Sequence, residues 1–92
     1  MIKSFAHKDL EDFFLYGVTR EIQAKHVARL EGLLDRLDAA IAIKAIEFPG
    51  SGLHKFKRAL QAHWAVKASD NWRLTFRFEA GDAHAVDYQD YH

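Results

Sequence analysis

The sequence predicts an α+β fold: a mostly antiparallel β-sheet with two N-terminal helices packed on one of its faces, in the order β-α-α-β-β-β. Three observations support this prediction. Apolar residues repeat with helical spacing in the first half, apolar and polar residues alternate in the second half, and turn residues separate the alternating segments. The 92 residues, 49% of them hydrophobic, suffice for one domain spanning residues 1–92.

The first half contains a short strand and two helices. Residues 2–5 alternate apolar and polar, which is typical of a strand. A first helix is predicted from residue 7 or 8 to residue 16, and Gly17 then occupies the left-handed position that ends many helices. A second helix is predicted from about residue 23 to residue 40, because apolar residues recur every three or four positions. This apolar stripe consists of Val27, Leu30, Leu33, Leu34, Leu37 and Ile41.

The second half is expected to supply the rest of the sheet. Residues 41–47 are compatible with one further helical turn, and the Phe-Pro-Gly-Ser-Gly segment at 48–52 then interrupts any regular element. The basic residues that follow it are expected in a loop. Strands are predicted in three alternating segments, namely 63–67, 72–78 and 83–88, with turns at 69–71 and 79–82. Within the middle strand, one face carries Trp72, Leu74, Phe76 and Phe78, and the other carries Arg73, Thr75 and Arg77.

Charge is balanced in total but uneven along the chain. There are 13 Lys and Arg against 13 Asp and Glu, yet residues 50–77 hold six cations and one acid. Residues 78–92 hold four acids and no Lys or Arg. Cations interleaved with aromatic residues bind phosphates and stack on bases, although a solvated face over an aromatic core has the same composition. Overall neutrality argues against a protein that coats nucleic acid and favours a local pocket.

Composition also excludes several classes of function. The chain has no Cys, which excludes disulfides, a thiol nucleophile and a Cys-based zinc site, and which is compatible with the cytoplasm. The six His show no pair at metal-ligand spacing on one helical face, so no metal and no cofactor are expected. No apolar run approaches the roughly 20 residues that cross a membrane, so no membrane partner is expected.

The residues that could carry chemistry fall in three segments, 54–58, 71–73 and 90–92. Strand ends that are far apart in a meander can converge in space, because the chain reverses at each turn. Together these segments suit metal-free cleavage of RNA, in which a 2′-hydroxyl attacks the adjacent phosphate. The reaction needs a group that accepts the hydroxyl proton, a group that protonates the 5′ leaving oxygen, and cations on the transition state.

Each of these roles has candidates in the three segments. Proton transfer could involve His54, Asp90, Tyr91 and His92. Lys57 and Arg73 would hold the phosphate, arginine through two donors. A loop histidine is usually only a surface residue, so a structural interpretation of His54 stays open. The other charged and histidine residues fit structural positions: Lys67 and Arg77 on strands facing solvent, His63 and His84 in strands, and His7 and His26 on the helical side without partner spacing.

Four segments of the chain match a known family. They are Met1-Ile2-Lys3-Ser4-Phe5, Leu53-His54-Lys55-Phe56-Lys57, Asn71-Trp72-Arg73-Leu74-Thr75-Phe76 and Asp90-Tyr91-His92. With them the chain resembles the HigB-type plasmid-maintenance killer toxins of the RelE/ParE superfamily over its full length. The resemblance implies a RelE-like toxin of a type II toxin-antitoxin system, an mRNA interferase that cuts message in the ribosomal A site without a metal and so inhibits translation. It implies as partners the ribosome, A-site mRNA, a HigA-like helix-turn-helix antitoxin, and operator DNA only through that antitoxin.

The resemblance also carries over site residues. The family's active-site positions fall on His54, Lys57, Asn71, Arg73, Asp90, Tyr91 and His92, and further contacts with RNA are expected from Asn71, Lys55, Lys67 and Arg77. The sequence departs from the family at Lys67, near which relatives tend to carry Arg, and at residues 57–60, which replace a Gly-Asp/Asn turn. Two alternatives remain: a ParE-like toxin that inhibits gyrase, and a non-catalytic module that binds RNA or protein.

Overall fold

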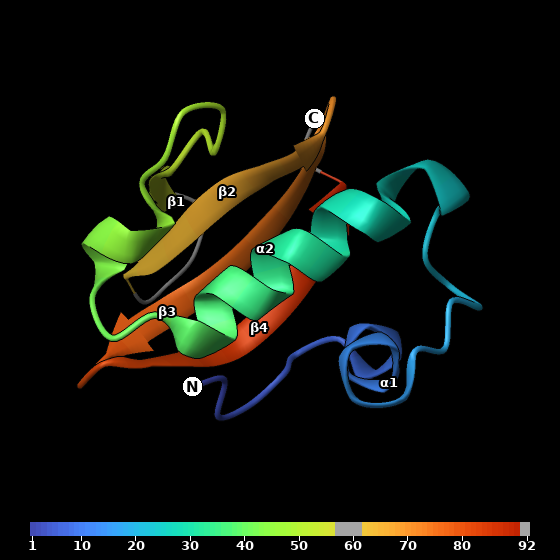
Figure 1. Ribbon diagram of the computed structural model, residues 1–92, viewed down its shortest axis with the longest axis horizontal. Coiled ribbons are helices and arrows are strands. Elements are labelled where there is room, and N and C mark those ends of the chain that lie inside the picture. The colour runs from blue at the N-terminus through green and yellow to red at the C-terminus, as the bar shows by residue number, and fades with distance from the viewer. Residues whose placement is uncertain (57–61, 91–92) are drawn as a thin grey trace.

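The structure, a computed structural model, describes residues 1–56 and 62–90 and confirms the predicted α+β fold. Its helices are α1 (Lys8–Tyr16), the 3-10 turn η1 (Ala24–His26), α2 (Val27–Ala39) and the 3-10 turn η2 (Ile43–Ile46). Its strands are β1 (His54–Phe56), β2 (His63–Ser69), β3 (Trp72–Glu79) and β4 (Asp82–Asp90), antiparallel neighbours in the order β1-β2-β3-β4. Figure 1 shows α2 lying across one face of the sheet, with α1 beside it.

The two helices begin and end where local chemistry dictates. The His7 side chain accepts a hydrogen bond from the Leu10 backbone N–H at 3.0 Å, which caps α1. Gly17 has φ 72 and ends α1, as its place in the sequence predicts. The expected second helix is divided into η1 and α2. It ends at Ala39 because Ala40 is extended, with ψ 135.

The buried core lies between the helices and the sheet, with α2 as its main helical layer. Its largest fully buried side chains come from both layers: Leu30, Leu34 and Leu37 of α2, and Val66, Leu74 and Phe76 of the sheet. The expected stripe therefore holds, except at Ile41. That side chain is 86% exposed, because the helical periodicity stops before it. Thr75, expected on the polar face of its strand, is completely buried.

The expected N-terminal strand is reduced to a partial pairing with β4. Ile2 and Phe5 form isolated parallel bridges with Ala83 and Val86. Between these bridges the register of β4 shifts, and the Ser4 hydroxyl accepts a hydrogen bond from the Ala85 backbone N–H at 2.8 Å. Because a side chain takes the place of a backbone partner there, the ladder is interrupted and no continuous strand forms.

The basic segment after residue 52 is a strand rather than the expected loop. His54, Lys55 and Phe56 pair with Ala65, Trp64 and His63 of β2, in that order, and form the edge of the sheet. Proline and glycine do break the chain at 48–52, but Gly50 and Gly52 have φ 86 and 64 and so reverse it directly onto β2. Among the described residues, no helix is long and apolar enough to cross a membrane.

Two glycines give a matched test of the helical assignments. Gly32 lies exposed within α2, and a Cβ added there would meet nothing within 4 Å. We expect Gly32→Ala to raise the free energy of unfolding by about 0.5–1 kcal/mol, because alanine loses less conformational entropy on folding. Gly17 has equally open space but a left-handed φ of 72, so Gly17→Ala should lower the free energy of unfolding by about 1 kcal/mol. Urea denaturation measures both changes, and a change of the same sign would contradict the assignments.

Candidate functional site

Two cations lie directly opposite each other on the face of the sheet that points away from α2. The register of β2 and β3 pairs Lys67 with Arg73. Val66 and Ala68 are buried in the core between the sheet and α2, so Lys67 between them points to the other face. Like charges at directly opposed positions destabilise a sheet, whereas an anion placed between them would be stabilised by both.

Backbone carbonyl groups hold the Arg73 side chain at the end of its strand. Its Nη1 donates hydrogen bonds to the carbonyl oxygen of Asp70 at 2.6 Å and to that of Trp72 at 3.0 Å. Asp70 lies in the β2–β3 turn with φ 43, a conformation that aspartate tolerates better than most residues. The turn that contains Asn71 therefore also holds the Arg73 side chain through its backbone carbonyl groups.

His54 lies next to this cation pair, on the neighbouring strand β1 and diagonally opposite Lys67. It is exposed, and it pairs with Ala65, two residues before Lys67. Its ring Nδ1 lies 2.9 Å from the carbonyl oxygen of Gly52. Since a carbonyl oxygen can only accept, Nδ1 donates, and the neutral ring keeps a lone pair on Nε2. His54 is thus oriented to accept a proton through Nε2.

The loop before His54 is fixed against Lys67. The backbone N–H of Lys67 donates to the carbonyl oxygen of Ser51 at 2.8 Å. Gly52 packs so closely that an added Cβ would lie 3.3 Å from the Lys67 Cβ, and its φ of 64 also requires glycine. From α2, Arg29 donates to the carbonyl oxygens of Gly50 at 2.8 Å and of Lys67 at 3.0 Å. This clamp holds the loop and β2 together.

The remaining predicted site residues divide between the two ends and faces of the sheet. Asn71 lies in the β2–β3 turn, and Asp90 lies opposite Trp72 at the same end as Arg73. Lys55 points to the opposite face from His54, with its Nζ 5.9 Å from the centre of the Trp64 ring. Arg77 lies toward the other end of β3, where its Nη1 pairs with Glu79 at 2.9 Å. Lys57, Tyr91 and His92 lie outside the described residues.

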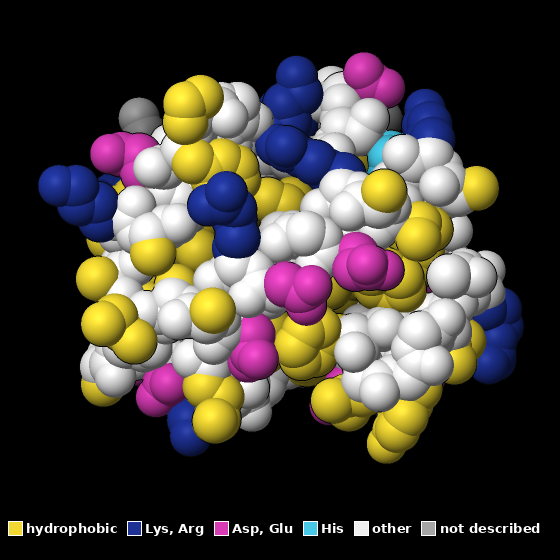
Figure 2. All heavy atoms as spheres, in the orientation of Figure 1, with side chains coloured by type: hydrophobic (Ala, Val, Ile, Leu, Met, Phe, Trp, Pro, Cys, Tyr) yellow, Lys and Arg dark blue, Asp and Glu magenta, His cyan; other side chains and the backbone are white. Residues whose placement is uncertain are grey.

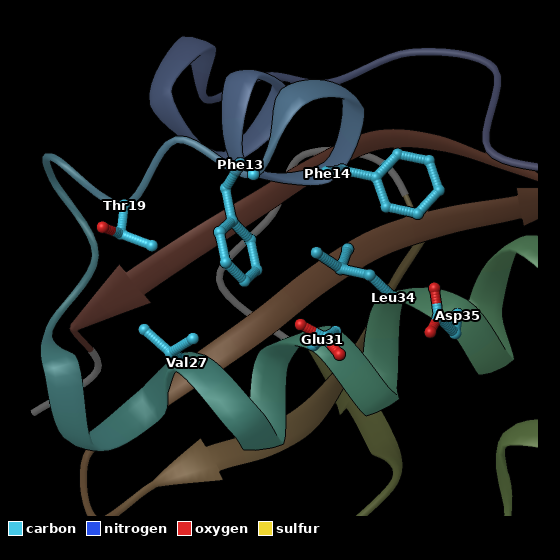
Figure 3. A pocket seen from close by; sticks show the side chains of 8 residues that line it. Phe13, Phe14, Thr19, Val27, Glu31, Leu34 and Asp35 are labelled. Carbon is cyan, nitrogen blue, oxygen red and sulfur yellow. The ribbon is translucent and has the colours of Figure 1, made fainter.

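A groove of about 470 Å³ lies on the other side of the molecule, between α1 and α2. Figure 3 shows Phe13 reaching from α1 toward α2, where Val27 and Glu31 line the groove. Asp35 adds a second carboxylate one helical turn after Glu31. Figure 2 shows acidic side chains among hydrophobic ones near the middle of this side. Two carboxylates repel a phosphate, so this groove does not suit RNA.

A buried aromatic cluster beneath the β2–β3 turn was not predicted from the sequence. The His26 side chain is completely buried, and its Nδ1 shares a hydrogen bond with the Tyr88 hydroxyl. Burial lowers the pKa of His26, and the charge of Lys25 adds to this effect. Burial likewise raises the pKa of Tyr88. One signal was available: His26 lies four residues before Leu30 and so extends the apolar stripe.

The fold and this face define a small α+β protein with two opposed cations on one face of its sheet and an oriented histidine beside them. Among the described residues, no group of three or more His, Cys, Asp or Glu could hold a metal ion. Residues 3–92 match the family model of the RelE-like toxin of type II toxin-antitoxin system HigB. The chain is also 39% identical to the Endoribonuclease HigB of Proteus vulgaris over 92 residues, which cover 100% of both chains. The chain therefore belongs to the HigB family of RelE-like toxins, and such a toxin has an antitoxin as its partner.

The neutral, buried imidazole of His26 predicts a loss of stability in mild acid. Its pKa is lowered from 6.5 in the folded protein, so the unfolded chain takes up the proton at a higher pH. The free energy of unfolding should therefore fall as the pH drops below about 6.5, by at most about 1.4 kcal/mol per pH unit. Urea denaturation between pH 7.5 and 5.5 measures this slope. His26→Gln should remove this contribution, and an unchanged slope in that variant would contradict the assignment.

Proposed function

We propose that the protein is a metal-independent endoribonuclease that cleaves mRNA in the ribosomal A site and so inhibits translation. The name of the 39% identical relative, Endoribonuclease HigB, supports the reaction class. The observation that carries the proposal is the opposition of Lys67 and Arg73 next to an oriented His54. A phosphodiester between the two cations would lie within reach of a proton acceptor.

The chemistry follows from this arrangement. The 2′-oxygen of one nucleotide attacks the adjacent phosphorus, and its proton passes to a base, for which His54 Nε2 is oriented. The bond from phosphorus to the 5′-oxygen breaks, giving a 2′,3′-cyclic phosphate and a 5′-hydroxyl. The leaving oxygen takes a proton from a second group, for which the sequence offers Asp90, Tyr91 and His92 as candidates. Arg73 and Lys67 stabilise the negative charge that develops on the phosphate oxygens.

Ribosome dependence fits the charge of the chain. The formal net charge is zero, so few uncompensated cations are available to hold RNA by counterion release. If the ribosome positions the message, a local grip on one phosphate is sufficient. The same proposal places the protein in the cytoplasm. It gives the protein a HigA-like helix-turn-helix antitoxin and, through that antitoxin only, operator DNA.

Replacing Arg73 tests the cation pair. We expect Arg73→Ala to reduce mRNA cleavage by about 100-fold or more, because a transition-state charge loses a fixed donor. Cleavage is measured by primer extension on a defined message translated in a purified system. Lys44→Ala is the matched control, since Lys44 is an exposed cation in η2 and is not one of the predicted site residues. Equal rates for the two variants would contradict the proposal, provided that both unfold cooperatively.

Omitting the ribosome tests where the substrate is bound. We expect efficient cleavage, in register with the reading frame, only when ribosomes translate the message. Naked mRNA at the same concentration should be cut slowly, because the protein itself binds RNA weakly. Efficient cleavage of naked mRNA would contradict ribosome dependence. Growth arrest without any cleavage would instead favour a ParE-like action on gyrase.

A further inference from the structure

The buried cluster beneath the β2–β3 turn joins η1 to the segment that contains Asn71 and Arg73. The Trp72 ring, between these two residues in the sequence, stacks on the Tyr88 ring with centroids 4.4 Å apart and planes 28° apart. The His26 ring lies against both, with its centroid 5.8 Å from each of the other two. The turn thus rests on a three-ring contact below the sheet.

A histidine at position 26 has an energetic cost, so packing alone does not explain why this residue is a histidine. His26 Nε2 is buried and has no hydrogen-bond partner among the described residues. Leaving such a buried group unsatisfied lowers the free energy of unfolding, a loss that an apolar ring at position 26 would avoid. What the imidazole provides is one fixed bond to the Tyr88 hydroxyl, 62 residues away in the sequence. That bond restrains the ring on which Trp72 stacks.

A second link joins the same elements at the surface. Lys25 Nζ lies 3.7 Å from Asp70 Oδ2, in the turn whose carbonyl accepts a hydrogen bond from Arg73. Both side chains of this ion pair are largely exposed, so it contributes little stability. The buried contact through Tyr88 is therefore the rigid one of the two.

We propose that His26 and Tyr88 are positioning residues: their buried hydrogen bond holds the Tyr88 ring against Trp72 and thereby sets where Asn71 and Arg73 meet the RNA. Neither residue touches the substrate. The proposal rests on the proposed endoribonuclease function and goes beyond it, because it assigns a role to the helix-side layer of the fold. A small displacement of a positioned cation has a large effect on rate, since fixed geometry supplies much of the catalysis.

Tyr88→Phe is the sharpest substitution, because it removes the hydroxyl and leaves the ring that stacks on Trp72. We expect the cleavage rate at saturating ribosomes to fall by about tenfold, with little change in the ribosome concentration giving half-maximal rate. The matched control is Leu37→Ala, which removes a fully buried side chain at the other end of α2. Leu37→Ala should destabilise the fold at least as much as Tyr88→Phe does and leave the cleavage rate unchanged. The rates of both variants are measured under conditions in which each variant is folded.

A double-mutant cycle separates positioning from general loss of structure. If the hydroxyl acts through Arg73, Tyr88→Phe should lower the rate about tenfold in the native background and hardly at all in Arg73→Ala. Equal effects in both backgrounds, or a native rate in Tyr88→Phe, would overturn the proposal. His26→Gln keeps a polar group at position 26. If this variant folds, its cleavage rate should be lowered about as much as that of Tyr88→Phe.

NMR keeps the test independent of enzymatic activity. The backbone amide resonances of Asn71 and Arg73 should shift in Tyr88→Phe, whereas those of Gly81 at the far turn should not. If the native protein cuts no mRNA, the proposed function fails, and these resonances still report whether the buried bond positions the turn. If the native protein cuts mRNA and the turn resonances are unchanged in Tyr88→Phe, only the positioning proposal fails.

Discussion

The register between β2 and β3 is the constraint on which the site depends. It places Lys67 opposite Arg73 on the face away from α2, and a register shift between Lys67 and Ser69 then brings the turn into place. Side chains alternate between faces, so a slip of one residue would point Lys67 into the core and Val66 out of it. Burial of Val66 therefore fixes the position of the cations, although neither cation belongs to the core.

The helix layer supports this face from two sides. Arg29 of α2 ties the loop before His54 to β2 through the carbonyl oxygens of Gly50 and Lys67. The residue just before α2, His26, contacts the rings that lie under the β2–β3 turn. α2 and the η1 turn before it thus hold both parts of the site, namely the loop before His54 and the turn before Arg73. The groove between α1 and α2, lined by Glu31 and Asp35, lies on the side of the molecule away from them.

Local periodicity predicted most of the fold, and long-range contacts account for what it missed. The helices and the three long strands have clear apolar patterns, and Gly17 marks a helix end. The strand at His54 has only three residues and no alternation of apolar and polar residues. It forms because it pairs with the edge of β2, so the sequence could not predict it. For the site, sequence segments indicated His54, Asn71 and Arg73, but their spacing came only from the register. The partner of His26 lies 62 residues away, beyond any local pattern.

The most direct test of the opposed cations is an NMR titration with a deoxytrinucleotide, which has the phosphates of RNA but no 2′-hydroxyl to attack. The native protein is labelled with ¹⁵N, and the backbone amides and the Arg73 Nε–H resonance are followed. We predict that the shifts concentrate at His54, Lys67 and Arg73 and are absent from Phe13 and Glu31 in the helical groove. Shifts confined to the groove, or none at Arg73 and Lys67, would contradict a phosphate site between the two cations.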